Sequence, residues 1–403
     1  MPGSFLHPFA KPTRERFVTI ERGEGALLWD ADGHELIDSM ASLWYCNVGH
    51  GRTEIADAVA DQIRTIESYS CFDPFTNGPA DDLADRIADL APMPDARVFF
   101  ANSGSEAVDS AMKLARLAQV QAGHPERRLI ISRDRGYHGT NYGGTSAQGL
   151  PLNKAGYGEL LADVVQVPAD DVEALSVLMS EHADRIAAVI TEPVQGAGGV
   201  FPPADGYLAE ARRLCDQHGA FLIFDEVITG FGRLGTWFAA QHFGVIPDLT
   251  TFAKAVTSGY VPLGGVVVGS RVRAALEGDD DFILRHGYTY SGHAAACAAA
   301  LTNIDIIESE GLLDAGQRMG ARLADGLHAI AADGRVDHVR GMPAVFGVGL
   351  LPQHDALAVR DAMLAGGVIT RAIGPNTVTF CPPLVTTDEQ VDRIVDVLAE
   401  AVA

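Results

Sequence analysis

Two charged residues, Asp225 and Lys254, each stand at the end of an apolar run, where their side chains could do chemistry together. Residues 221–225 and 249–253 have the length and bulk of buried parallel strands. Both side chains are therefore expected at the carboxyl edge of an open α/β sheet, where such sheets bind ligands. A neutral lysine amine condenses with an aldehyde to a Schiff base, and a carboxylate can hold a protonated ring nitrogen.

This pair of functions is what pyridoxal phosphate requires, because that cofactor combines an aldehyde with a ring nitrogen. An ordinary α/β sheet explains either residue alone equally well, with Asp225 capping a helix and Lys254 on the surface. A nicotinamide site is a further alternative, since residues 230–235 fit the pattern G-x-G-x-x-G and Asp248 follows them. The spacing argues against it, because the first glycine does not directly follow the strand and Pro247 interrupts a second strand.

A third element could bind an anion. The strand-like run 97–101 leads into Ser103, Gly104 and Ser105, and apolar positions between residues 107 and 118 then follow a helical period. Free backbone N–H groups and the helix dipole make such a junction attractive to a phosphate, and Gly104 would let the phosphate approach closely. Simple N-capping by Ser103 or Ser105 is the alternative.

Together these stretches resemble the signature of the class III, fold type I, pyridoxal-phosphate aminotransferases. The resemblance extends over nearly the whole chain and is closest to the ω-amino acid and amine:pyruvate transaminases. The matching residues are Asp225-Glu226-Val227, Gly230-Phe231-Gly232-Arg233, Pro247-Asp248-Leu249, Lys254 and Ser258-Gly259-Tyr260.

The resemblance implies an α/β fold, in which a large domain has a mostly parallel sheet flanked by helices and a smaller α+β domain is built from both ends of the chain. Residues 26–30 and 35–38 read as a hairpin, and Thr387 with Gln390 forms a capping box before a last helix. The expected division is an N-terminal arm with part of the small domain in 1–50, the large cofactor-binding domain in 51–295, and the C-terminal small domain in 296–403.

The cofactor implied by the resemblance is pyridoxal 5'-phosphate. Lys254 would be its Schiff-base lysine and would carry the proton, while Asp225 keeps the ring nitrogen protonated. Glu192 and Glu226 are expected to anchor the surrounding loops. The other implied contacts are Ser103, Gly104 and Ser105 at the phosphate, Tyr137 and Val227 on the two ring faces, His138, Glu192, and the partner subunit's Thr289.

A substrate pocket is also implied. Its expected residues are Phe9, Trp44, Phe72, Tyr137 and Ala197, with Phe72 reaching the neighbouring subunit's pocket. Without the resemblance, Trp44 would be assigned to packing and Arg371 to a surface ion pair. In relatives the residue matching Arg371 clamps a substrate carboxylate, which suits a planar guanidinium.

The expected activity is transfer of an amino group from a primary amine or ω-amino acid to pyruvate or another 2-oxo acid, in two half-reactions. Ile228 favours this type, because members that use ornithine or γ-aminobutyrate commonly carry glutamine there. Other donors of the same fold stay open, namely β-alanine, taurine, a diamine or 4-aminobutyrate, as does the acceptor 7-keto-8-aminopelargonate. A phospho-lyase or epimerase reaction is a further alternative, and a non-catalytic binding protein is disfavoured by the intact Asp225 and Lys254 pair.

The composition limits which binding partners and which cellular compartment we expect for this protein. The chain has 403 residues and a formal net charge of −23, so nucleic acid and anionic membrane surfaces would be repelled. Five scattered cysteines and an N-terminus without a signal-peptide pattern indicate a cytoplasmic protein with neither a disulfide framework nor a metal site. We expect a homodimer with active sites shared across the interface, and a tetramer is possible by pairing of dimers.

Overall fold

The computed structural model describes residues 4–403, and its largest element is a seven-stranded sheet in the order β4-β10-β9-β8-β7-β5-β6. Strands β9, β8, β7, β5 and β6 run parallel, whereas β10 is antiparallel to both β4 and β9. The strands are β4 (Arg97–Ala101), β5 (Leu129–Arg133), β6 (Val164–Val167), β7 (Ile186–Thr191), β8 (Phe221–Asp225), β9 (Leu249–Phe252) and β10 (Gly264–Val268).

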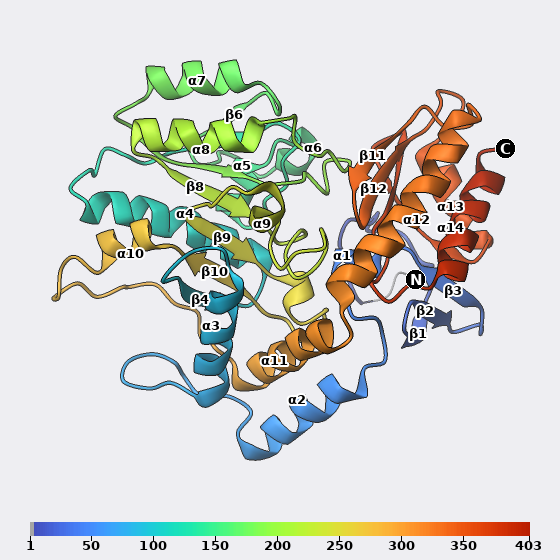
Figure 1. Ribbon diagram of the computed structural model, residues 1–403, viewed down its shortest axis with the longest axis horizontal. Helices are drawn as coiled ribbons and strands as arrows, with labels where there is room; N and C mark the ends of the chain where they lie inside the picture. The colour runs from blue at the N-terminus through green and yellow to red at the C-terminus, as the bar shows by residue number, and fades with distance from the viewer. Residues whose placement is uncertain (1–3) are drawn as a thin grey trace.

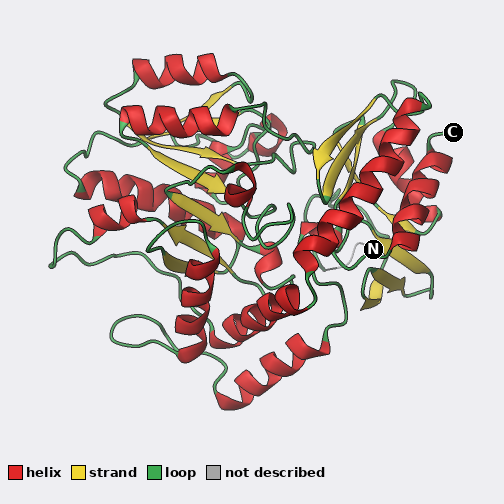
Figure 2. Cartoon of the chain, viewed as in Figure 1, coloured by secondary structure: helices red, strands yellow, loops and turns green. Residues whose placement is uncertain are grey.

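Helices cover both faces of this sheet (Figures 1 and 2). One face packs against α8 (Tyr207–His218), and the other packs against α4 (Gly104–Gln121). Within β8, Leu222 and Phe224 enter the apolar cluster under α8, while Phe221 and Ile223 enter the cluster under α4. Because alternate side chains of a strand point to opposite faces, a strand buried on both sides must be apolar throughout, as the runs predicted.

A four-stranded antiparallel sheet forms a smaller part of the molecule, in the order β11-β12-β15-β14. Its strands are β11 (His338–Met342), β12 (Val345–Gly349), β14 (Arg371–Ile373) and β15 (Thr377–Phe380). Three helices pack with it: α12 (Leu312–Ala332), α13 (Ala356–Ala365) and α14 (Asp388–Ala401). The predicted capping box of α14 is confirmed, since Thr387 and Gln390 each accept a hydrogen bond from the other's backbone N–H.

A third sheet joins the two ends of the chain. Its strands are β1 (Ile20–Glu24), β2 (Leu27–Asp30), β3 (Glu35–Asp38) and β13 (Val368–Ile369), in that order. The β2–β3 hairpin confirms the sequence prediction, and β3 continues into a parallel pair with β13. The N-terminal segment and the C-terminal part are thereby hydrogen-bonded to each other, while the exact division at residues 50 and 295 stays a prediction.

The remaining helices connect these sheets. They are α1 (Ala41–Trp44), α2 (Thr53–Thr65), α3 (Gly78–Leu90), α5 (Tyr142–Ala147), α6 (Pro151–Lys154), α7 (Val172–Glu181), α9 (Ala239–Phe243), α10 (Ser270–Leu276) and α11 (Ala294–Ser309), with a short 3-10 turn at Lys254–Val256. Among residues 4–403, none of the helices has the length and apolar character needed to cross a membrane.

Candidate active site

The carboxyl ends of four neighbouring parallel strands carry the residues singled out in the sequence. Asp225 is the last residue of β8, and Lys254 follows β9 in the 3-10 turn. Tyr137 and His138 follow β5, and Glu192 follows β7. Neighbouring strands β5, β7, β8 and β9 place these residues at one sheet edge, as expected for a ligand site in a parallel sheet.

Lys254 sits in a strained and enclosed position. Its φ is +49°, in the left-handed region that residues other than glycine seldom adopt. Burial lowers the pKa of its amine, and the negative charges of Asp225 and Glu192 oppose that shift. A lowered pKa increases the fraction of neutral amine, which is the form that attacks an aldehyde.

Asp225 is buried and held by three hydrogen bonds. His138 Nδ1 lies 2.8 Å from Oδ2, and Oδ1 accepts from Thr251 Oγ1 at 3.0 Å and from the Val227 N–H at 3.2 Å. Nε2 of His138 is buried and has no hydrogen-bond partner within residues 4–403. A carboxylate fixed in this way can point its free lone pairs at one ligand atom.

Glu192 joins two loops at the same edge. Its Oε1 accepts from the Tyr137 N–H at 2.8 Å, and its Oε2 accepts from the Gly196 N–H at 2.9 Å. Burial raises the pKa of this carboxyl to about 7, helped by the nearby Asp225 charge and opposed by His138 and the two N–H groups. Glu192 therefore holds the loop after β5 to the loop after β7 through these two hydrogen bonds.

Glu226 anchors a different segment. Its carboxylate accepts from the N–H groups of Ala239 and Ala240 at the start of α9, and from Thr229 Oγ1 at 3.0 Å. Burial raises the pKa of Glu226 to about 7, and the N–H donors oppose the shift.

The start of α4, where the sequence predicts an anion site, carries the Ser103 N-cap that was considered as the alternative, and the phosphate site stays a prediction. Ser103 caps the helix by accepting from the Glu106 N–H at 3.2 Å, and Ser105 Oγ accepts from the Thr140 N–H at 3.0 Å. A Cβ at Gly104 would lie 2.8 Å from Val227 Cγ1, two residues beyond Asp225. The bare glycine therefore keeps the helix N-terminus against the loop that follows β8. Such a helix N-terminus would fit a phosphate bound near Asp225.

Trp44 packs against the glycine loop after Glu192, and Ala197 is part of that loop. Trp44 is buried, with a φ of +69°, and packs with Ile228 and Val194. A Cβ at Gly196 would come within 2.7 Å of Trp44 Cζ3 and 2.5 Å of Ile228 Cδ1. Ala197 follows directly and is partly exposed, so the two residues border one side of the sheet edge.

Arg371 begins β14 and is partly buried. Burial lowers its pKa, and the Tyr137 hydroxyl opposes this shift, so the two side chains are near each other. Within residues 4–403 the guanidinium has neither an ion pair nor a hydrogen bond. The surface ion pair considered as the alternative is thus not what the structure has, and the cation is available to a ligand.

Three residues predicted for the site are exposed in the single chain. Phe9 is 75% exposed, Phe72 is 54% exposed and Thr289 is exposed. Phe72 and the segment before Thr289 lie side by side, because a Cβ at Gly287 would be 2.7 Å from the Phe72 ring. Their roles stay predictions, which for Phe72 and Thr289 require a second subunit.

Two polar contacts of the site were missed from the sequence. Thr251 donates to Asp225, and Thr140 supports Ser105. Thr251 could have been identified from the sequence, since it is a polar residue inside the apolar run that leads to Lys254. Thr140 could not, because only the folded loop after β5 brings it to the start of α4.

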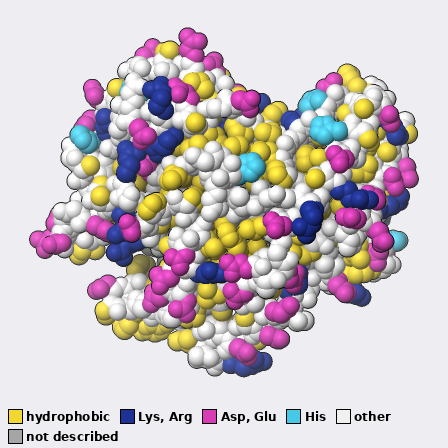
Figure 3. All heavy atoms as spheres, viewed as in Figure 1, with side chains coloured by type: hydrophobic (Ala, Val, Ile, Leu, Met, Phe, Trp, Pro, Cys, Tyr) yellow, Lys and Arg dark blue, Asp and Glu magenta, His cyan; other side chains and the backbone are white. Residues whose placement is uncertain are grey.

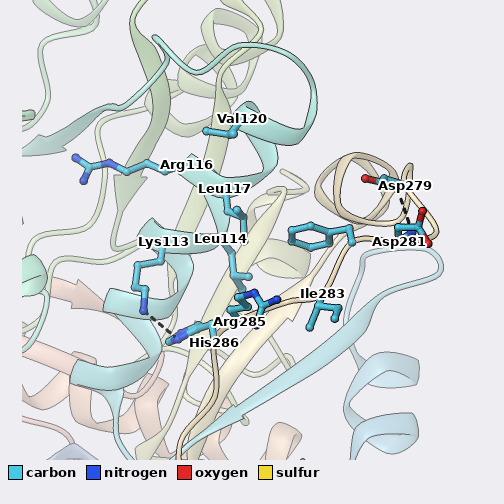
Figure 4. A pocket seen from close by; sticks show the side chains of 11 residues that line it. Lys113, Leu114, Arg116, Leu117, Val120, Asp279, Asp281, Ile283, Arg285 and His286 are labelled. Atoms are coloured by element: carbon cyan, nitrogen blue, oxygen red, sulfur yellow. Dashed lines mark hydrogen bonds between the residues drawn. The ribbon is translucent and has the colours of Figure 1, made fainter. Parts of the chain in front are cut away.

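A large cavity lies away from this edge, between α4 and the loop before Thr289 (Figure 4). It measures about 670 Å³, and a hydrogen bond of 3.0 Å joins Lys113 Nζ to His286 Nδ1 in its wall. Its lining contains Leu114, Leu117, Val120, Phe282 and Ile283 with several charged residues, and none of the residues predicted for the active site.

The sheet edge has the parts of a fold type I pyridoxal-phosphate site: a lysine after one strand, a carboxylate at the end of its neighbour, and a helix N-terminus for the phosphate. Comparison with known proteins agrees. The family model for class III aminotransferases matches residues 9–402, and the chain belongs to that family. It is therefore an enzyme that uses pyridoxal 5'-phosphate, and the expected fold class is confirmed.

Individual relatives are similar over almost their whole length. A β-alanine–pyruvate aminotransferase of Pseudomonas aeruginosa is 37% identical, over 100% of this chain and 94% of its own. The structure of a transaminase from the marine bacterium Virgibacillus superposes with a TM-score of 0.96 at 38% identity, covering 99% of this chain and 96% of that one. The structure of an amine transaminase from an uncultivated Pseudomonas species was solved in its PLP-bound (internal aldimine) form. It superposes with a TM-score of 0.94 at 34% identity, covering 100% of this chain and 98% of that one.

Proposed function

We propose that this transaminase moves the amino group of an apolar primary amine or ω-amino acid to pyruvate. The observation that carries the proposal is Arg371, a partly buried guanidinium near Tyr137 without any ion-pair partner within residues 4–403. An unpaired buried cation is costly unless a ligand anion meets it, and a guanidinium binds a carboxylate in a two-pronged way. Pyruvate, alanine and β-alanine all carry that carboxylate.

The donor side of the proposed site is apolar. Trp44 and Ile228 pack over Gly196, and Glu192 holds the loop of Gly196 to the loop that carries Tyr137. A donor such as 1-phenylethylamine has no carboxylate and would be held by this apolar wall alone. Figure 3 shows a notch between the two parts of the molecule with hydrophobic side chains inside it. Relatives named for pyruvate and for amines support the assignment.

The bound cofactor supplies an electron sink that stabilises negative charge on the substrate carbon. Lys254 would hold it covalently and, once released by the incoming amine, would move the proton at that carbon. Asp225, oriented by His138 and Thr251, would keep the ring nitrogen protonated. Tyr137 and Val227 would lie against the ring faces, and Ser103, Gly104 and Ser105 would bind the phosphate.

We also propose a cytoplasmic homodimer that completes each site with the partner subunit's Thr289, and in which Phe72 reaches the neighbouring pocket. Exposed apolar side chains near these residues support it, because contiguous exposed apolar surface is characteristic of interfaces. They include Tyr69 at 52%, Phe72 at 54%, Phe75 at 51%, Ile283 at 64% and Tyr290 at 60% exposure.

The test is a visible absorbance spectrum of the purified protein before and after addition of single amines without any oxo acid. We expect a cofactor band that 1-phenylethylamine or β-alanine bleaches and pyruvate restores, with alanine as the product. A band that 1-phenylethylamine, β-alanine, putrescine and taurine all leave unchanged would overturn the donor assignment. Release of inorganic phosphate or of ammonia in place of alanine would indicate a lyase.

A further inference from the structure

We propose that Arg340 is a positioning residue that sets the affinity of the site for substrate carboxylates, an inference that rests on the proposed function. Arg340 lies on β11, at the edge of the small sheet opposite to β14, which carries Arg371. Its Nε donates to the carbonyl oxygen of Gly199 at 2.8 Å, and its Nη2 donates to Thr377 Oγ1 at 3.0 Å. One side chain thereby bonds to both the large and the small part of the molecule.

The contact with the large part is reinforced by an aromatic ring. Phe201 lies between two guanidinium groups, with the Arg135 carbon 4.1 Å and the Arg340 carbon 4.3 Å from its ring centroid. Arg135 forms an ion pair with Asp170, whereas Arg340 has no carboxylate partner within residues 4–403. The hydrogen bonds of Arg340 therefore go to Gly199, Thr377 and His338.

Arg340 acts on a loop that borders the active site. Gln195 and Phe201 pair through two backbone hydrogen bonds of 3.0 and 2.8 Å, which close residues 196–200 into a short loop. At one end of the loop, Gly196 donates to Glu192 and lies under Trp44. At the other end, Gly199 has a φ of +128°, and a Cβ there would be 2.9 Å from the Phe201 ring. Ala197 lies between these two fixed points.

The contact with the small part leads to Arg371. Thr377, which accepts from Arg340, begins β15 and pairs with Ile373, while Thr379 pairs with Arg371. Figure 1 shows β11 and β12 on the side of the small part that faces the large sheet. Arg340 thus holds the strand pair that carries Arg371 at a set distance from the loop that carries Ala197. A carboxylate bound to Arg371 must fit within that distance.

The variants Arg340→Gln and Arg340→Lys test this role. Glutamine removes the charge and the ring contact, whereas lysine keeps the charge but loses the planar fork that serves two acceptors at once. The matched control is Arg322→Gln in α12, because Arg322 also belongs to the small part but forms only exposed ion pairs, with Asp392 and Asp388.

We expect Arg340→Gln to raise the KM for pyruvate about 10-fold with kcat within about 2-fold of wild type. The kcat/KM for benzaldehyde, an acceptor without a carboxylate, should change less than about 2-fold. The KM of Arg340→Lys for pyruvate should fall between the values for Arg340→Gln and wild type. The KM of Arg322→Gln should match that of wild type. The dissociation constant of propionate, measured by calorimetry on the holoenzyme, should rise in parallel with the KM for pyruvate.

The proposal would be overturned if the Arg340 variants lost kcat/KM equally with pyruvate and with benzaldehyde. It would also be overturned if these variants unfolded at the wild-type temperature and bound propionate as tightly as wild type. Wild-type protein that binds propionate but does not turn over pyruvate would reject the proposed function instead. The propionate comparison would then still decide the role of Arg340. Wild-type protein that fails to bind propionate would overturn the inference itself.

Discussion

His138 Nδ1 lies 2.8 Å from Asp225 Oδ2, and both side chains are buried at the carboxyl edge of the large sheet. The imidazole donates from Nδ1 if its proton is there, which leaves Nε2 as an acceptor, and Nε2 has no partner within residues 4–403. The pair fixes the direction of the carboxylate that would meet the cofactor ring nitrogen.

Changing His138→Gln should lower kcat by about 10-fold, because Asp225 would keep two of its three hydrogen bonds but lose its orientation. Asp225→Asn should lower kcat by about 100-fold or more, since an amide cannot keep the ring nitrogen protonated. Single-turnover rates with one amine would measure both effects. The pairing would have no catalytic part if His138→Gln reacted at the wild-type rate.

Lys254→Ala should abolish transamination while leaving cofactor bound through the phosphate site at the start of α4. The reason is that alanine offers neither the covalent attachment nor the base. Dialysed protein would be assayed for retained cofactor by absorbance and for alanine formation from pyruvate. Full turnover in this variant would exclude Lys254 as the catalytic lysine.

Arg371→Met should raise the KM for pyruvate by about 10- to 100-fold, which corresponds to the roughly 1.5–3 kcal/mol of a hydrogen bond to a charged group. Bleaching of the cofactor band by 1-phenylethylamine should stay within about 2-fold of wild type, because that donor has no carboxylate. Comparing the two half-reactions separates carboxylate binding from damage to the cofactor site. Equal losses of activity in the two half-reactions would contradict the assignment of Arg371 to carboxylate binding.

The raised pKa of Glu226, about 7 against an ordinary 4.5, predicts a pH effect on stability. Between these values the folded carboxyl holds a proton that the unfolded one has lost, so its contribution to stability falls as pH rises from about 4.5 to 7. The slope is at most about 1.4 kcal/mol per pH unit. Urea unfolding at several pH values should show wild type losing stability relative to Glu226→Gln over this range.

Glu277 supplies the control for that experiment. It is exposed, and its hydrogen bond with Arg273 lowers the pKa of its carboxyl. The stability contribution of Glu277 is present above its unfolded pKa and is lost as pH falls, which is the opposite direction. A Glu226→Gln difference that stays constant between pH 5 and 7 would contradict the raised pKa.

Gly196→Ala should destabilise the protein by about 1–3 kcal/mol, because the added methyl would overpack against Trp44 and Ile228. Its nearest neighbour would be Ile228 Cδ1, at 2.5 Å. The double variant Gly196→Ala/Ile228→Val removes that carbon and should recover part of the loss. Thermal unfolding of the two variants gives the comparison, and no recovery would mean that Trp44 alone limits the space.

The sequence by itself determined the features that short segments encode. The β2–β3 hairpin, the strand β4 and the capping box of α14 follow from residue period and turn chemistry within short windows. The placement of Asp225 and Lys254 on neighbouring strands was also predictable, because each ends an apolar run and parallel strands align their carboxyl ends. The family resemblance supplied the cofactor and most of the candidate residues.

Only the tertiary structure decided which polar groups meet. Thr251, Thr140 and Arg340 contact the site through strand pairing and loop packing between segments far apart in the chain, and no local pattern encodes such pairs. Burial decided the raised pKa of Glu192 and the lowered pKa of Lys254, since desolvation depends on the whole surrounding shell. Phe72 and Thr289 are both exposed in the single folded chain, so the proposed homodimer would be needed to bring them into a site.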